Sequence, residues 1–328
     1  MKPAEERYER ILRSRAGAII IAIGALAAML LATDLVAPFP WSGNHGIIFP
    51  SPALWFSGNV ADLTVLGLQL LVAVLLVVMN HVYTISRSAS ITFAALFLVL
   101  QAMEPSLATT LQGGPFVALV MVLVSMLLLS AYNRPRQVRS IFLAFFMVSG
   151  GALAQVAFVA YVPALLVGLM QMRVFRLKGL IAAVLGTVAP WWTLWCFGIM
   201  EMPHPHWALS VSFLSSMPRA ELIHLIASVA LTVGLGIGLT AVNLLRIMSL
   251  NSRTRAMNGW LVTLGLFTSV ALLFDSDNIA AYVTLLNVLA AFQMGSFMQI
   301  FAGKRCSYTV VTAVLVVSLG LYIWALWI

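Results

Sequence analysis

Long apolar stretches separated by short polar segments fill the chain from residue 16 to its end. Most of them are about 15 to 25 residues long, and a helix needs about 20 residues to cross the hydrocarbon core of a bilayer. The pattern therefore predicts an all-α polytopic membrane protein with about eleven transmembrane helices. The predicted spans are residues 16–33, 63–80, 89–103, 115–132, 140–153, 155–172, 179–200, 220–245, 258–274, 279–301 and 308–327.

Residues 141–172 are short for two crossings. Each half of this segment would reach roughly 24 Å as a helix, against a hydrocarbon core of ~30 Å. We expect a short hairpin that turns at Gly150-Gly151. Both of its ends lie on the same side whether or not it crosses fully, so the orientation of the other spans does not depend on it.

Composition supports the membrane assignment and excludes other classes. Of 328 residues, 62% are hydrophobic and 9% are charged, whereas a soluble domain has about 25% charged residues. These values exclude an ordinary soluble domain, a disordered chain and a coiled coil. We expect one membrane domain over residues 16–328, preceded by a basic tail over residues 1–15.

The basic residues predict the orientation. All but one of the 18 Lys and Arg residues fall in alternate loops, and Arg219 is the exception. Cytoplasmic loops retain Lys and Arg, so the N-terminus is predicted to be cytoplasmic and the C-terminus extracytoplasmic. The net charge of +8 then reflects topology, and we expect no nucleic-acid partner. Cys196 and Cys306 would lie on opposite sides of the membrane, which excludes a disulfide between them.

The centres of the predicted spans contain no Asp, Glu, Lys, Arg or His. Ion-coupled transporters usually carry an ionisable group or a broken helix near the midplane, so this pattern is evidence against proton-coupled transport. Gly234-x-x-x-Gly238 indicates close packing between helices. The polar residues inside the spans are Gln69, Gln155, Asn243, Asn287 and Gln293.

Candidate chemistry lies in the predicted outer segments. Asp34 ends the first span, where a partly desolvated carboxylate could act as a general base; alternatively, it marks where the helix meets water. Arg219 follows Ser216 at a predicted helix start, where free N–H groups and a guanidinium favour a phosphate. The alternative for Arg219 is a surface ion pair with Glu221 or Glu201.

A second group of outer residues has the side chains of metal ligands. Glu201, His204 and His206 lie in one loop. Glu221 and His224 are three positions apart at the start of the next span, which places them on one face of a helix. The five side chains could together hold a divalent metal ion. The alternative is a polar loop that lies on lipid headgroups.

The central third of the chain resembles known membrane proteins. The residues that carry this likeness are Glu104-Pro105, runs 129–134, 145–154 and 161–169, the basic stretch 173–178 and Pro190-Trp191-Trp192. Residues 85–195 resemble a family of uncharacterised bacterial inner-membrane proteins. They are more distantly similar to the lipid-linked-sugar glycosyltransferases of the C superfamily. The resemblance implies a bacterial inner membrane, a polyprenyl-phosphate-linked sugar donor and an outward-facing active site.

The resemblance also implies roles for two residues. The family's catalytic acid lies in the first outer loop, often as an Asp-Glu pair. The matching position here is Asp34, which Leu35 follows. We therefore expect a glycosyltransferase-like protein in which Asp34 deprotonates the acceptor hydroxyl, while Arg219 and the helix start at Ser216 hold the donor phosphate. The alternative is a non-catalytic membrane subunit or a transporter of lipids or small molecules.

Overall fold

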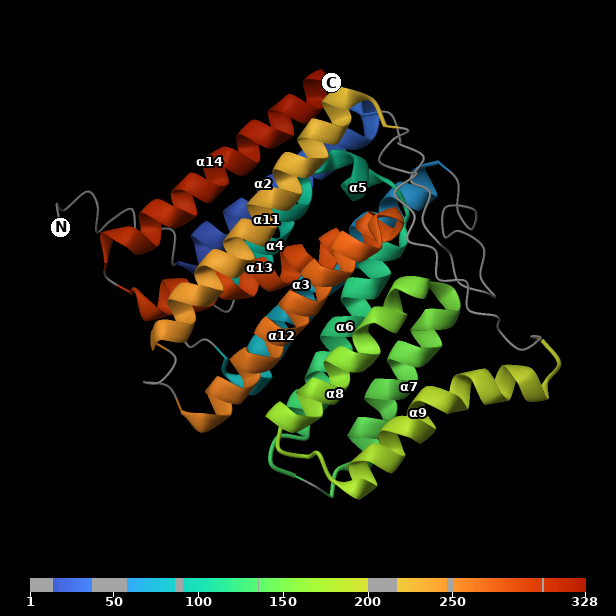
Figure 1. The fold of residues 1–328 in the computed structure, drawn as a ribbon. Coiled ribbons are helices and arrows are strands. Elements are labelled where there is room, and N and C mark those ends of the chain that lie inside the picture. The colour runs from blue at the N-terminus through green and yellow to red at the C-terminus, as the bar shows by residue number, and fades with distance from the viewer. Residues whose placement is uncertain are drawn as a thin grey trace.

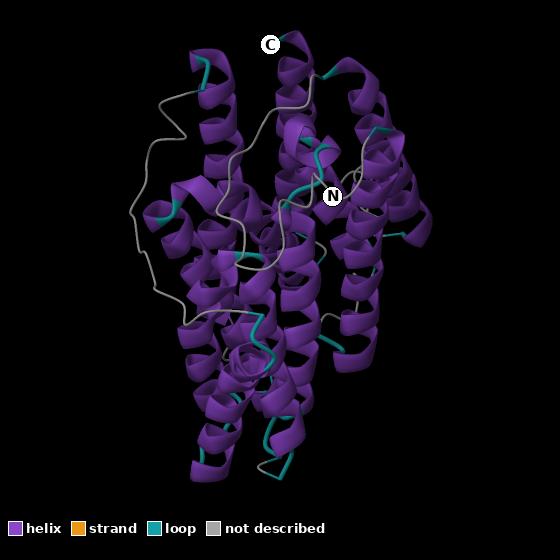
Figure 2. Ribbon diagram, turned by 90° about the vertical axis from the view of Figure 1, so that its right-hand side faces the viewer, coloured by secondary structure: helices purple, strands orange, loops and turns teal. Residues whose placement is uncertain are grey.

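The computed structural model describes residues 14–36, 58–85, 91–134, 136–199, 217–246, 251–302 and 304–328. The regular structure in these ranges is entirely helical (Figure 2). Long helices lie side by side and share one general direction (Figure 1). The prediction of an all-α membrane protein is therefore confirmed.

Every predicted span coincides with helical structure. Among the described residues, eight helices are long and apolar enough to cross a membrane, whereas α4, α7 and α8 are shorter. The sidedness of the bundle and the number of full crossings stay predictions. The elements are α2 (Arg15–Leu35), α3 (Asn59–Tyr83), α4 (Thr92–Ala102), α5 (Pro105–Thr109), α6 (Gly113–Ser130), α7 (Val138–Ala154), η2 (Val156–Ala160), α8 (Tyr161–Gln171), α9 (Leu177–Cys196), α11 (Arg219–Arg246), α12 (Ser252–Phe274), η4 (Ser276–Asn278), α13 (Ile279–Ile300) and α14 (Arg305–Trp327).

The segment 141–172 does form a short hairpin, but its turn differs from the prediction. Gly150 and Gly151 lie inside α7, and the chain turns at Gln155 and through η2. The helices α7 and α8 have 17 and 11 residues. A β-carbon built on Gly151 would lie 2.8 Å from the ring of Phe158. The small residue is therefore needed for close approach of the returning chain, and not for the turn itself.

Helix α13 is the centre of the bundle. It packs against α4, α6, α11 and α12, and its residues from Ile279 to Met298 are all buried. A helix that is apolar on every side is stable only when other elements surround it. Helix α4, which is also buried along almost its whole length, supplies part of that surrounding layer.

Hydrogen bonds between polar side chains join α4, α11 and α13 inside the bundle. Thr232 Oγ1 of α11 donates to Asn287 Oδ1 of α13 at 2.9 Å. Asn287 Nδ2 in turn lies 3.1 Å from Gln101 Oε1 of α4. Further along, Asn243 Nδ2 donates to Gln293 Oε1 at 3.0 Å. A buried polar group without a partner would be costly, so these pairs explain how amides occupy the interior of the spans.

Helices α7, α8 and α9 lie together on one side of this core (Figure 1). Helix α9 packs closely along α7, where a β-carbon on Gly186 would lie 2.5 Å from the carbonyl oxygen of Phe142. Trp191 Nε1 donates to Ser149 Oγ at 2.8 Å across the same contact. Cys196 and Cys306 are free and exposed, as the predicted topology requires.

Candidate functional site

A break between α4 and α5 places a carboxylate inside the bundle. Glu104 lies between the two helices, and Pro105 is the first residue of α5. A proline disfavours helical geometry in the residue before it, so the helix ends there and the chain changes direction. The side chain of Glu104 is only 2% exposed. Charged residues are rarely buried this far unless they have partners.

Helix α11 supplies two partners for Glu104. His224 Nδ1 lies 3.3 Å from Glu104 Oε1, and one turn later Ser228 Oγ donates a hydrogen bond to the same oxygen. The other ring nitrogen of His224 lies 3.0 Å from the carbonyl oxygen of Leu321 in α14. The edge of the imidazole also meets Trp324, with ring centroids 5.3 Å apart. Three helices therefore fix the imidazole and the carboxylate relative to each other.

These contacts determine how many protons the pair holds. The carbonyl oxygen of Leu321 can only accept a hydrogen bond, so Nε2 of His224 carries hydrogen. Without a second proton, the Nδ1 lone pair would face the Glu104 carboxylate at 3.3 Å, which is repulsive in a buried site. One further proton therefore lies between Nδ1 and Oε1. When His224 holds this proton, the contact is an ion pair and Glu104 keeps its carboxylate form.

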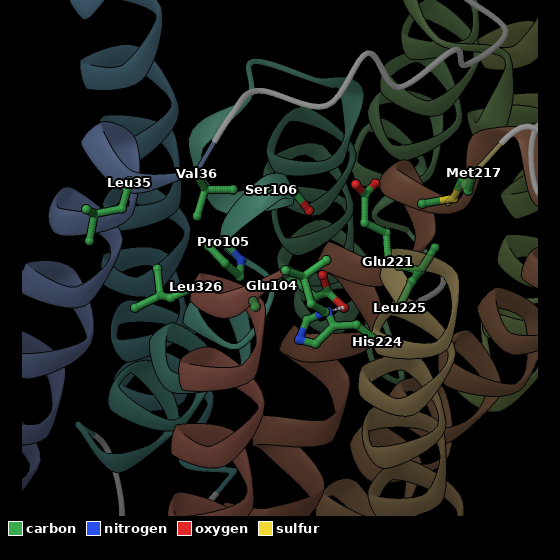
Figure 3. Close-up of a pocket in the computed structure, with 12 residues that line it drawn as sticks. Leu35, Val36, Glu104, Pro105, Ser106, Met217, Glu221, His224, Leu225 and Leu326 are labelled. Carbon is green, nitrogen blue, oxygen red and sulfur yellow. Dashed lines mark ion pairs between the residues drawn. The ribbon is translucent and has the colours of Figure 1, made fainter. Parts of the chain in front are cut away.

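The pair opens onto a pocket of about 280 Å³ at one end of the bundle (Figure 3). The sequence predicts this end to be the outer one, because α2 ends there and α11 begins there. Apolar side chains of Leu35, Val36 and Leu326 stand on one side of the pocket, and Met217 stands on the other. The remaining described lining residues are Glu104, Pro105, Ser106, Glu221, His224, Leu225, Ala325 and Ile328.

The two outer residues predicted to carry chemistry flank this pocket. Asp34 is exposed and directly precedes Leu35, which lines the pocket. Arg219 is exposed and lies between Met217 and Glu221, which also line it. Neither Asp34 nor Arg219 is itself a lining residue. The end of α2 and the start of α11, which are far apart in the sequence, therefore meet at one site.

Glu221 and His224 both line the pocket, as their shared helix face predicts. Ser216, Glu201, His204 and His206 lie outside the described residues. Within the ranges that are described, no group of three or more His, Cys, Asp or Glu side chains is arranged to hold a metal ion. The metal site predicted from these five residues therefore stays a prediction.

Sequence reasoning did not select Glu104 or Ser228 as site residues. The signal for Glu104 is its position directly before Pro105 at the end of an apolar stretch, where a helix must stop. Ser228 lies 124 positions away from Glu104 in the chain, and a lone serine in an apolar helix has no distinguishing pattern. These groups come together because α4 and α11 both pack against α13.

Comparisons with protein-family models and with curated proteins found no match to this chain. The likeness over residues 85–195 therefore remains an expectation. What the protein does has to be inferred from the geometry and charge of its pocket.

Proposed function

We propose that this protein is a membrane-embedded transferase that joins a lipid-linked sugar to an acceptor hydroxyl at the outer membrane face. A single observation carries the proposal: a buried carboxylate, held by a histidine and a serine, opens onto a half-apolar pocket at the end of the helices. The apolar wall suits the lipid part of a substrate, and the carboxylate suits a hydroxyl that must lose its proton.

The reaction would proceed as a displacement at the sugar carbon. The acceptor hydroxyl oxygen bonds to that carbon as its proton passes to Glu104. The bond from the carbon to the phosphate oxygen breaks, and the polyprenyl phosphate leaves with the electron pair. His224 and Ser228 position the carboxylate and do not touch the substrate. Negative charge develops on the leaving phosphate, which a nearby cation and helix N-terminus would stabilise.

The proposal gives proton acceptance to Glu104 and phosphate binding to Arg219. Glu104 is buried and lines the pocket, whereas Asp34 is exposed at its rim. A carboxylate inside the pocket can reach a hydroxyl that is bound there, whereas one at the rim lies outside the lining. Arg219 starts α11 beside the pocket, where its guanidinium and the first N–H groups of the helix could grip two phosphate oxygens.

The test is a comparison of lipid-linked sugars in a deletion strain of the source organism. The extracted lipids would be separated and identified by mass spectrometry, and the strain complemented with wild-type protein, Glu104→Gln or Asp62→Asn. Asp62 lies in the first turn of α3 and does not line the pocket, so it is a matched acid-to-amide control. Each variant would be quantified in isolated membranes before the comparison.

The proposal expects one lipid-linked sugar to accumulate in the deletion strain. Wild-type protein and Asp62→Asn should remove it, whereas Glu104→Gln should leave it in place although it retains nearly the volume of Glu104. Unchanged lipid-linked sugars in the deletion strain would contradict the proposal. The protein would then be better described as a transporter or a non-catalytic membrane subunit.

A further inference from the structure

One acidic side chain of the pocket lies outside the Glu104–His224 pair. Glu104 Oε1 and His224 Nδ1 face each other at 3.3 Å, and the carbonyl oxygen of Leu321 lies 3.0 Å from the other ring nitrogen. No Lys or Arg is among the described residues that line the pocket. Apart from that pair, Glu221 is the only ionisable side chain among the described lining residues.

The carboxylate of Glu221 is available to a ligand. Among the described residues, no hydrogen bond or ion pair joins it to another side chain. Arg219 lies two positions before it on α11, and residues two apart on a helix face in different directions. Figure 3 shows this carboxylate on the side of Glu104 and His224 where Ser106 also lies. A carboxylate and a hydroxyl are both acceptors for an ammonium group.

From this charge distribution we infer that the substrate is an amphiphile whose head carries a positively charged primary amine, which Glu221 binds. The inference rests on the proposed function and names the class of acceptor that this site takes. The apolar wall of Leu35, Val36 and Leu326 faces the lipid part of the molecule. The pocket of about 280 Å³ is large enough for a small polar headgroup. An ammonium at Glu221 would make charge-assisted hydrogen bonds, which are about twice as strong as neutral ones.

Two amphiphiles that differ in one group provide the test. Purified protein in neutral maltoside micelles would be heated with equal mole fractions of dodecylamine or dodecanol, and its unfolding temperature recorded. A ligand that binds only the folded state raises this temperature. We expect the amine to raise it by about 2 °C more than the alcohol when its concentration is roughly ten times its dissociation constant.

Glu221→Gln should abolish the difference between the amine and the alcohol, whereas Asp62→Asn should keep it. Because this readout needs no turnover, Glu104→Gln should also retain the difference. A loss of turnover together with retained amine stabilisation thus separates the two proposals. Equal stabilisation by amine and alcohol, or a difference that persists in Glu221→Gln, would overturn the inference even if the enzyme proves active.

Two further pairs of amphiphiles distinguish the natural sources of the amine. Phosphatidylethanolamine would be compared with phosphatidylglycerol, and a dodecyl glucosaminide with the corresponding dodecyl glucoside. Stabilisation by phosphatidylethanolamine alone identifies an aminophospholipid, and stabilisation by the glucosaminide alone identifies an amino sugar. If neither amine-bearing lipid stabilises the protein through Glu221, the inference is wrong.

Discussion

His224 places Nδ1 3.3 Å from Oε1 of Glu104, although Glu104 directly precedes α5 and His224 lies in α11, with α6 to α9 between them in the chain. Both side chains are at least nine-tenths buried. Each side chain gives the other a polar partner inside the bundle, since a buried charge without a partner is strongly destabilising. The pair is therefore part of the fold as well as part of the pocket.

The interdependence of this pair can be measured with a double-mutant cycle. His224→Leu should lower the free energy of unfolding by about 3 kcal/mol, because it leaves the buried Glu104 with only the Ser228 hydroxyl as a partner. Adding Glu104→Leu should restore most of that loss, since both polar groups are then gone. Thermal unfolding in detergent would report the effect. Losses that simply add would show that the two side chains do not depend on each other.

Gly295 in α13 is required for close packing against α4. A β-carbon at this position would lie 1.9 Å from Cε1 of Phe93, and Phe93 is itself fully buried against Phe292. Gly295→Ala should therefore cost about 1–3 kcal/mol of stability through overpacking. Gly234→Ala is the matched control, because a β-carbon there would meet no described atom within 4 Å. A stable Gly295→Ala variant in the same unfolding assay would argue against this tight contact.

Much of the fold could be predicted from the sequence because lipid permits few solutions. A spanning segment in lipid must satisfy its own backbone hydrogen bonds, so a long apolar run is a helix. The ends of the helices differ more from the predicted span boundaries. Helix α12 begins at Ser252, six residues before the predicted span, since a helix can continue beyond the hydrocarbon core. The prediction of a turn at Gly150-Gly151 was wrong, because glycine also occurs where two segments pack closely.

The site was only partly predictable, since its members come from distant elements. Glu221 and His224 share a helix face by local spacing alone, and both line the pocket. Their meeting with Glu104 depends on how α4, α11 and α14 pack, and no local pattern encodes that. A local pattern can also indicate a contact that the packing does not make. Gly234-x-x-x-Gly238 predicted close helix packing, but neither glycine has a described neighbour within 4 Å of its β-carbon position.

The orientation of the bundle follows from the distribution of basic residues and can be tested directly. A reporter fused after Arg136 should read cytoplasmic, and one fused after Asp277 should read extracytoplasmic. Insertion of each fusion would be checked by the amount of full-length protein in the membrane fraction. A cytoplasmic signal after Asp277 would place the pocket on the opposite face and remove the basis for an outer active site.

The last prediction concerns the phosphate site at the pocket rim. Arg219→Lys keeps the positive charge but loses the planar fork that can hold two phosphate oxygens. It should therefore raise the KM for the lipid-linked donor, and Arg219→Ala should raise it further, by about tenfold to a hundredfold. The fall in kcat should be smaller, because the rim holds the donor while Glu104 accepts the proton. Asp34→Asn, on the other side of the rim, should have little effect on either constant if Glu104 is the base.

Turnover in membrane vesicles at several donor concentrations would give both constants. Arg136→Ala, in a basic loop predicted to be cytoplasmic, is the control for general damage to insertion. An unchanged KM in Arg219→Ala would remove Arg219 from the donor site. Loss of kcat in Asp34→Asn, with Glu104→Gln still active, would return the role of base to Asp34. The two rim variants and Glu104→Gln thus assign the proton and the phosphate to separate residues, because each step changes a different kinetic constant.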